Sequence, residues 1–148
     1  LSIYLKEFFG LKASAWDTRV LATDISQQAL SKALKGVYNC PADMPKAWLS
    51  RYFVKTDTAG LYSVAPVIRD NVIFRTFNLM DPIRFRLKFD VIFCRNVMIY
   101  FDQPTRDALV ERFRQAMNPR GYLFISHSES LGQNPNFQLV APAVYRKK

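Results

Sequence analysis

Short apolar runs alternate with helical patterns along this chain, and their order limits the folds that it can adopt. The runs that predict buried strands are Val20–Thr23, Val72–Phe77, Phe89–Cys94 and Tyr122–Ile125. The helical patterns cover Ser2–Phe9, the stretch from Ser26 to Gly36, and a longer stretch that begins at Asp102 or Gln103 and continues through Met117. Strands that alternate with helices form a mostly parallel sheet with helices on its faces. We therefore predict an α/β fold.

The stretch between residues 51 and 77 has a different character. Its β-prone pieces are short, and turn residues separate them. They are Tyr52–Val54, Leu61–Val64 and Val67–Ile68. Such pieces are typical of a small antiparallel hairpin or meander. Farther along the chain, Pro119 and Gly121 predict the end of the long helix, and the residues around Pro142 predict a terminal hairpin of Phe137–Ala141 with Ala143–Tyr145.

The composition is typical of one folded domain in a reducing compartment. The chain has 148 residues, of which 49% are hydrophobic and 22% are charged, so we expect a core and no bulk disorder. Its apolar runs are too short to cross a bilayer, and residues 1–9 do not resemble a secretory signal. Two cysteines, Cys40 and Cys94, make neither a disulfide framework nor a zinc site. We predict a cytoplasmic protein without a bound metal.

Basic residues outnumber acidic ones by 21 to 12, which gives a formal net charge of +9. Such a charge can bind nucleic acid, hold a protein on an anionic membrane or steer an acidic protein partner toward it. The lysines and arginines are scattered, as in Arg84–Lys88 and Arg112–Arg114, and this distribution is equally typical of a solvated surface. The charge alone leaves these alternatives open.

Polar side chains follow the predicted strands at the point where each strand ends. They are Asp24, Asn78, Arg95 with Asn96, and Ser126 with His127. Ligands of open α/β sheets bind beyond the carboxyl ends of the strands, and a carboxylate together with amides can bind a ribose and a purine. The alternative is that Asp24 and Asn78 only cap the segments after them, as Asx residues often do. Both explanations fit the pattern.

Five motifs follow one another in a recognisable order. They are Leu21–Ser26, Arg51–Phe53, Asn78–Leu79, Phe93–Phe101 with the sequence FCRNVMIYF, and Gly121–Leu131. Together they resemble the CheR family of chemotaxis receptor methyltransferases, from about residue 2 to residue 146. The resemblance implies a Rossmann-like methyltransferase sheet that uses S-adenosylmethionine and releases S-adenosylhomocysteine. It also implies a small inserted antiparallel β-subdomain, at residues 51–70 of a truncated catalytic domain that spans residues 1–148.

The resemblance implies a role for six residues near the cofactor. Asp24 matches the residue that contacts the ribose end, and Asn78 with Leu79 matches the pair beside the adenine. Arg95 with Asn96 matches a pair close to the cofactor, and Tyr100 matches an aromatic residue near the methyl donor. The predicted catalytic residues are Tyr100 and Arg95; the predicted cofactor-binding residues are Asp24, Asn78, Leu79, Arg95 and Asn96. Outside this motif, Tyr100 would be interpreted as a core residue beside Phe101.

The reaction that this resemblance implies is methylation of glutamate side chains on the cytoplasmic helices of chemoreceptors. A glutamate carboxylate is ionised at neutral pH, so its methylation needs no general base. His127 is therefore expected to line or support the site, and Cys94 to be a small core residue. The Val54–Gly60 connection is short for a family member that binds a tethering pentapeptide, so we expect a protein that works without such a tether.

Family members open this domain with a strand and a Gly-rich turn that have no match in these residues. In the family's sheet that strand lies between the strand ending at Asp24 and the strand ending at Cys94. Buried backbone groups left unpaired there would each cost on the order of 1–3 kcal/mol. We therefore expect these residues to be the C-terminal part of a longer enzyme, with weak or no cofactor binding on their own.

Two other function classes stay open. One is a non-catalytic methyltransferase-like module that binds or regulates a partner. The other is a nucleic-acid methyltransferase, which the basic charge favours. Such enzymes present a flipped or single-stranded base between aromatic side chains. The nearest match to their Asn/Asp-Pro-Pro-aromatic signature is Asp81–Arg84, which lacks the second proline and the aromatic residue.

Overall fold

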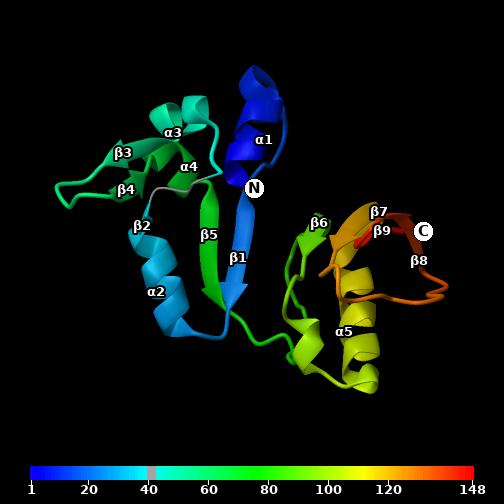
Figure 1. Ribbon diagram of the computed structural model, residues 1–148. Coiled ribbons are helices and arrows are strands. Elements are labelled where there is room, and N and C mark those ends of the chain that lie inside the picture. The colour runs from blue at the N-terminus through cyan, green and yellow to red at the C-terminus, as the bar shows by residue number, and fades with distance from the viewer. Residues whose placement is uncertain (40–42) are drawn as a thin grey trace. The chain divides into compact units, whose positions relative to one another are not determined.

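The computed structural model describes residues 1–39 and 43–148 and divides the chain into two compact units. Unit 1 comprises Leu1–Asn78, and unit 2 comprises Leu79–Lys148. Each unit forms its own hydrogen-bonded sheets (Figure 1). Cys40 lies outside the described residues. None of the helices in the described ranges has the length and apolar character that crossing a membrane requires.

Unit 1 combines a parallel strand pair with a small antiparallel sheet. Its elements in chain order are α1 (Ser2–Phe9), η1 (Gly10–Ala15), β1 (Val20–Asp24), α2 (Gln27–Lys35), β2 (Val37–Asn39), α3 (Lys46–Tyr52), β3 (Phe53–Lys55), β4 (Leu61–Val64), α4 (Pro66–Arg69) and β5 (Val72–Thr76). Strands β1 and β5 pair in parallel, and α2 packs beside both (Figure 1). The α2 helix has the predicted ends: the Ser26 hydroxyl accepts from Ala29 N, and Gly36 takes the left-handed conformation with φ of 62°.

The antiparallel sheet has the strand order β2-β4-β3. The predicted hairpin is present as β3 and β4, and the range 51–70 contains both strands together with α4. Strand β2 comes before residue 51 and pairs with β4, although the sequence predicted no strand there. The prediction of β structure at Val67–Ile68 was wrong, because Pro66 occupies the first position of α4 and its fixed φ favours a helical turn.

Helix α1 is attached to α3 by polar and aromatic contacts. Arg51 Nη1 lies 2.6 Å from Glu7 Oε1, and the Tyr52 hydroxyl donates a hydrogen bond to the same oxygen. The rings of Tyr4 and Trp48 meet edge to face with centroids 4.7 Å apart. The bond from Tyr52, more than the Arg51 charge, lowers the pKa of Glu7 below its usual value. These contacts hold α1 on the helix that leads into β3.

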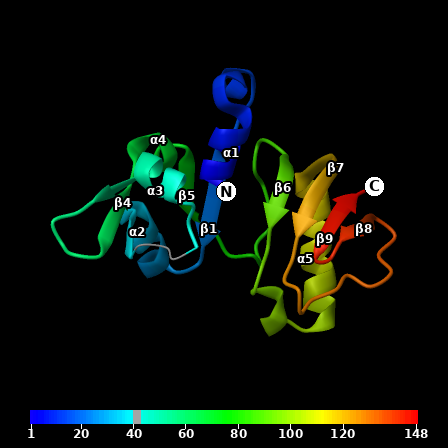
Figure 2. The same cartoon turned by 45° about the horizontal axis from the view of Figure 1, so that its top comes forward.

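Unit 2 is one mixed sheet packed on one long helix. Its elements are β6 (Phe89–Phe93), η2 (Met98–Tyr100), α5 (Gln103–Ala116), β7 (Met117–Phe124), β8 (Phe137–Ala141) and β9 (Val144–Lys147), in the sheet order β6-β7-β9-β8. The β6–β7 pair is parallel, and the predicted terminal hairpin is confirmed as β8 and β9. Helix α5 lies along one face of this sheet (Figure 2). The core between them consists of Cys94, Met98, Leu109, Val110, Phe113, Met117, Leu123, Ile125, Phe137 and Tyr145.

Strand β7 begins earlier than the sequence predicted. It starts at Met117, directly after α5, so Pro119 and Gly121 lie inside the strand and do not form a turn after the helix. The register places Phe89 opposite Met117 but Val91 opposite Tyr122, which makes a bulge on β7. A Cβ at Gly121 would lie 3.0 Å from the Asp90 carbonyl oxygen, so the bulge needs glycine at this close approach.

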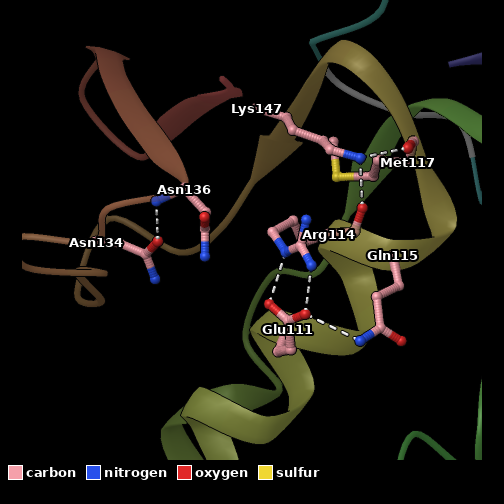
Figure 3. Close-up of polar contacts among 7 residues, drawn as sticks. All are labelled: Glu111, Arg114, Gln115, Met117, Asn134, Asn136 and Lys147. Atoms are coloured by element: carbon pink, nitrogen blue, oxygen red, sulfur yellow. Dashed lines mark hydrogen bonds and ion pairs between the residues drawn. The ribbon is translucent and has the colours of Figure 1, made fainter.

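The C-terminal end of α5 is capped by a side chain from β9. Lys147 Nζ donates to the carbonyl oxygens of Arg114 and Met117, each at 2.8 Å (Figure 3). On the same helix, Glu111 accepts two hydrogen bonds from the Arg114 guanidinium and one from Gln115. These bonds, with Arg114 contributing most, lower the pKa of Glu111 to about 2.

Strands β1 and β6 belong to different units, and each has one hydrogen-bonded neighbour among the described strands. In the described part of the chain, β1 is hydrogen-bonded to β5 alone and β6 to β7 alone. The parallel strands therefore lie in two hydrogen-bonded sheets, one in each unit.

Candidate functional site

The candidate residues of unit 1 lie together at one edge of the β1–β5 pair. Asp24 is the last residue of β1 and is paired with Thr76, the last residue of β5. The ladder continues through the bond from Phe77 N to the Asp24 carbonyl oxygen at 3.1 Å, and Asn78 follows directly. Parallel pairing thus brings Asp24 and Asn78 to the same end of the two strands, as predicted.

The Asp24 carboxylate accepts one local hydrogen bond and has further acceptor sites. Its Oδ1 accepts a hydrogen bond from Ser26 N at 2.7 Å, so the predicted capping role is present. The side chain is exposed, and a carboxylate offers about four acceptor sites. Capping and ligand binding were alternatives in the sequence, but this geometry accommodates both.

In unit 2, Arg95 and Asn96 follow β6 at its carboxyl end. The β6–β7 ladder continues to Cys94, whose N–H bonds to Phe124 O at 2.8 Å. Asn96 then takes the left-handed conformation with φ of 59°, which asparagine tolerates better than most residues. Arg95 and Asn96 are both exposed. The strand therefore ends in a sharp change of direction that presents two polar side chains to solvent.

Tyr100 lies at the end of η2 and points outward. Its exposed fraction is 79%, whereas Met98 in the same turn is 1% exposed. Met98 fixes the turn in the unit 2 core, and Phe101 packs against that core. The high exposure argues against the interpretation of Tyr100 as a core residue and leaves both its ring face and its hydroxyl accessible.

Leu79 lies beside the hydrophobic core of unit 2. It packs against the buried cluster, and its carbonyl oxygen accepts a hydrogen bond from Arg112 Nη2 at 2.9 Å. Because Arg112 is part of α5, this bond fixes the start of unit 2 on the helix. The side chain is half-buried, so part of it remains available as an apolar wall.

The turn after β7 contains a polar network that links it to Asn96. The Ser126 hydroxyl donates to Asn96 Oδ1 at 2.9 Å, and Ser126 N donates to Glu129 Oε2 at 2.8 Å. Ser126 and His127 were recognised as a strand end, and His127 is exposed there. The sequence did not single out Glu129, because its contact with Ser126 N depends on the turn between them.

Cys94 is a core residue, as predicted. It is 5% exposed and belongs to the unit 2 core. Burial, helped by the nearby charge of Glu129, raises the pKa of its thiol to about 12. Such a thiol is a poor nucleophile at neutral pH. The described residues also contain no group of three or more side chains that could hold a metal ion.

Comparison with known proteins assigns the chain to a family. The family model described as "CheR methyltransferase, SAM binding domain" matches residues 1–145. The chain belongs to the CheR methyltransferase family. This match confirms the predicted Rossmann-like α/β class and S-adenosylmethionine as the cofactor of the domain.

Named relatives cover most of the chain. The chemotaxis protein methyltransferase of Borreliella burgdorferi is 37% identical over 152 residues, which cover 99% of this chain and 53% of that protein. Chemotaxis protein methyltransferase 1 of Pseudomonas aeruginosa is 37% identical over 137 residues, with coverages of 88% and 50%. The chain therefore spans about half the length of the curated relatives it matches.

A solved structure is also similar to the chain. It is PKMT2 from Rickettsia typhi in complex with AdoHcy, with a TM-score of 0.46 and 20% sequence identity. The alignment covers 74% of this chain and 17% of that one. The assignment to the family rests on the sequence matches.

Proposed function

We propose that the protein transfers a methyl group from S-adenosylmethionine to glutamate side chains of chemoreceptors in the cytoplasm. The products are glutamate methyl esters and S-adenosylhomocysteine. The observation that carries this proposal is the family match over residues 1–145, a range that contains all the candidate site residues. The names of the relatives, chemotaxis protein methyltransferases, support the chemotaxis context and a chemoreceptor as the partner.

The side chains at the strand ends suit the chemistry of the cofactor. In unit 1, the exposed carboxylate of Asp24 can accept hydrogen bonds from ribose hydroxyls, and the amide of Asn78 can pair with a purine edge. In unit 2, Leu79 supplies apolar surface, and the exposed amide of Asn96 supplies a donor. We assign cofactor binding to these four residues and to Arg95.

The reaction needs orientation more than proton transfer. The cofactor, when bound, supplies a methyl group on a positively charged sulfur. The substrate glutamate is already ionised at neutral pH, so no residue has to remove a proton from it. The task of the protein is then to align the reacting atoms, which can lower the barrier substantially. Tyr100 offers an exposed aromatic face to a cation, and the exposed Arg95 offers a positive charge that orients an anionic group.

A methyl-transfer assay tests the proposal. The protein at its natural length is incubated with radiolabelled S-adenosylmethionine and receptor-containing membranes. We expect the label on the receptor, and we expect mild alkali to release it, because esters hydrolyse under conditions that leave methylated amines and bases intact. Label that resists alkali, or label found on nucleic acid, would contradict glutamate methylation. Unlabelled receptor with bound cofactor would favour the non-catalytic module.

An Asp24→Asn variant tests the cofactor site separately. The amide keeps the oxygen that accepts from Ser26 N, so the turn is retained while the charge is lost. We expect the affinity for S-adenosylhomocysteine in calorimetry to fall by about tenfold or more, since hydrogen bonds to charged groups contribute about 1.5–3 kcal/mol. Asp17→Asn is the matched control, because Asp17 is exposed in the same unit and pairs with Arg19. Equal affinities in the two variants would remove Asp24 from the site.

A further inference from the structure

We propose that Ser126 and Glu129 are positioning residues that orient the side-chain amide of Asn96 toward the cofactor. The inference rests on the proposed function, because it acts through a residue that the proposal places at the cofactor. All three residues belong to unit 2. They connect the carboxyl ends of the neighbouring parallel strands β6 and β7.

The first step is the bond that fixes the amide. The Ser126 hydroxyl donates to Asn96 Oδ1 at 2.9 Å, so the oxygen of the amide faces the turn after β7. The amide NH2 group lies on the opposite side of the same planar group and keeps two donors. Asn96 is exposed, so these donors face solvent and can meet an acceptor on a ligand.

The second step is that both partners of this bond are fixed by the backbone. Asn96 has φ of 59°, which sets the direction of its Cα–Cβ bond at the end of β6. Ser126 is 6% exposed; its N–H donates to Glu129 Oε2 at 2.8 Å, and its carbonyl oxygen accepts from Glu129 N at 3.1 Å. The Glu129 side chain and backbone therefore close a tight turn around the Ser126 backbone, and the Ser126 hydroxyl also lies 3.2 Å from the Ser128 hydroxyl.

The third step concerns the buried carboxylate of Glu129. The residue is 9% exposed, and its second carboxylate oxygen has no hydrogen-bond partner among the described residues. It lines a cavity of about 10 Å³ together with Arg106, whose buried Nε is also without a partner in the described part of the chain. A buried carboxylate with an unpaired oxygen destabilises a core. The other carboxylate oxygen of Glu129 accepts from Ser126 N, so the residue is used to fix the strand-end serine.

A double-mutant cycle tests this inference on the protein at its natural length. Ser126→Ala removes the hydroxyl, and Asn96→Gly removes the amide while tolerating the left-handed conformation. We expect Ser126→Ala to weaken S-adenosylhomocysteine binding about 5- to 10-fold, as expected for the loss of one oriented hydrogen bond. The KM for S-adenosylmethionine should rise by a similar factor. In the Asn96→Gly background, the same change should alter affinity by less than about twofold.

Matched variants separate orientation from folding. Ser126→Thr keeps a hydroxyl and should restore most of the affinity. Ser130→Ala is the control, because Ser130 lies in the same turn and its hydroxyl contacts Tyr145 instead of Asn96. The affinity of the Ser130→Ala variant for S-adenosylhomocysteine should equal that of the parent protein. If Ser126→Ala does not fold, Glu129→Ala replaces it in the cycle, because it removes the oxygen that accepts from Ser126 N.

The outcomes distinguish the inference from the proposed function. A Ser126→Ala effect that persists in full in the Asn96→Gly background overturns positioning through Asn96 and leaves the proposed function standing. An Asn96→Gly variant with unchanged affinity overturns both the inference and the assignment of Asn96 to the cofactor. Loss of the Ser126 effect in the Asn96→Gly background, with rescue by threonine, supports the inference.

Discussion

Cys94 and Asn96 lie two residues apart just after β6, but one is buried and the other is exposed. Cys94 continues the ladder of the strand and is 5% exposed, whereas Asn96 has left the strand and is exposed. The left-handed backbone at Asn96 follows the end of β6 and turns the chain from the core to the surface. A side chain with reactive chemistry is thus kept inside, and a side chain with hydrogen-bonding capacity is presented outside.

The pKa of Cys94 leads to a prediction about its reactivity. With a pKa of about 12, the thiol is ionised to about one part in ten thousand at pH 8. We expect iodoacetamide to label Cys94 slowly in the native protein, faster as the pH is raised toward 12, and rapidly after unfolding. A Cys40→Ser background keeps the other cysteine in the sequence from contributing. Mass spectrometry after timed alkylation measures the rate, and rapid native labelling at pH 8 would contradict the buried environment.

Single residues differed in how well the sequence revealed them. The strand-end positions of Asp24 and Asn96 could be predicted because each follows an apolar run, and a strand end is visible in a sequence. Glu129 was not found, because its role depends on a turn that brings its carboxylate back to Ser126 N. No periodic pattern records such a contact. The capping of Ser26 by Asp24 was predicted as an alternative to binding, and only the remaining acceptor capacity of the exposed carboxylate makes the two compatible.

At the scale of elements, the junction of α5 and β7 differs most from its prediction. A helix that passes directly into a strand leaves its last carbonyl groups without the usual glycine cap. Lys147 supplies donors to two of these carbonyls from β9 (Figure 3). Because Lys147 is 33 residues from Arg114 in sequence, the cap is a tertiary contact. Local residue patterns therefore predicted a turn at Pro119 and Gly121 where the strand in fact continues.

This cap leads to a prediction about stability. Lys147→Met keeps the apolar part of the side chain and removes both donors at the end of α5. We expect the free energy of unfolding to fall by about 1–2 kcal/mol, because a cation at a helix C-terminus and its hydrogen bonds each contribute on this scale. Lys148→Met is the matched control, since Lys148 is exposed and its backbone N–H bonds to Asn136 O. Urea unfolding of the protein at its natural length measures both variants, and an equal stability loss would remove the capping role.

At the scale of the molecule, the fold class could be predicted because it depends on the order of elements. The alternation of apolar runs and helices was enough for the α/β class, and the motif order for the family. Strand pairing was harder to predict than the fold class. Strand β2, for example, has only three residues, and all of them are exposed, so no alternation of apolar and polar residues marks it as a strand. The neighbours of β1 and β6 could not be predicted for the same reason. Local residue patterns do not record which strands hydrogen-bond to each other across a sheet.

The net charge leads to the last prediction. The chain carries a formal charge of +9, and the proposed substrate is a helix surface that bears glutamates. Opposite charges accelerate encounter, and salt screens this attraction over a Debye length of about 10 Å at 0.1 M. We therefore expect kcat/KM for the receptor to fall at least about threefold between roughly 0.05 and 0.5 M salt, while kcat at saturating receptor changes little. Methyl-transfer rates at several receptor concentrations separate the two quantities. A kcat/KM that does not respond to salt would leave the basic residues as a solvated surface without a steering role.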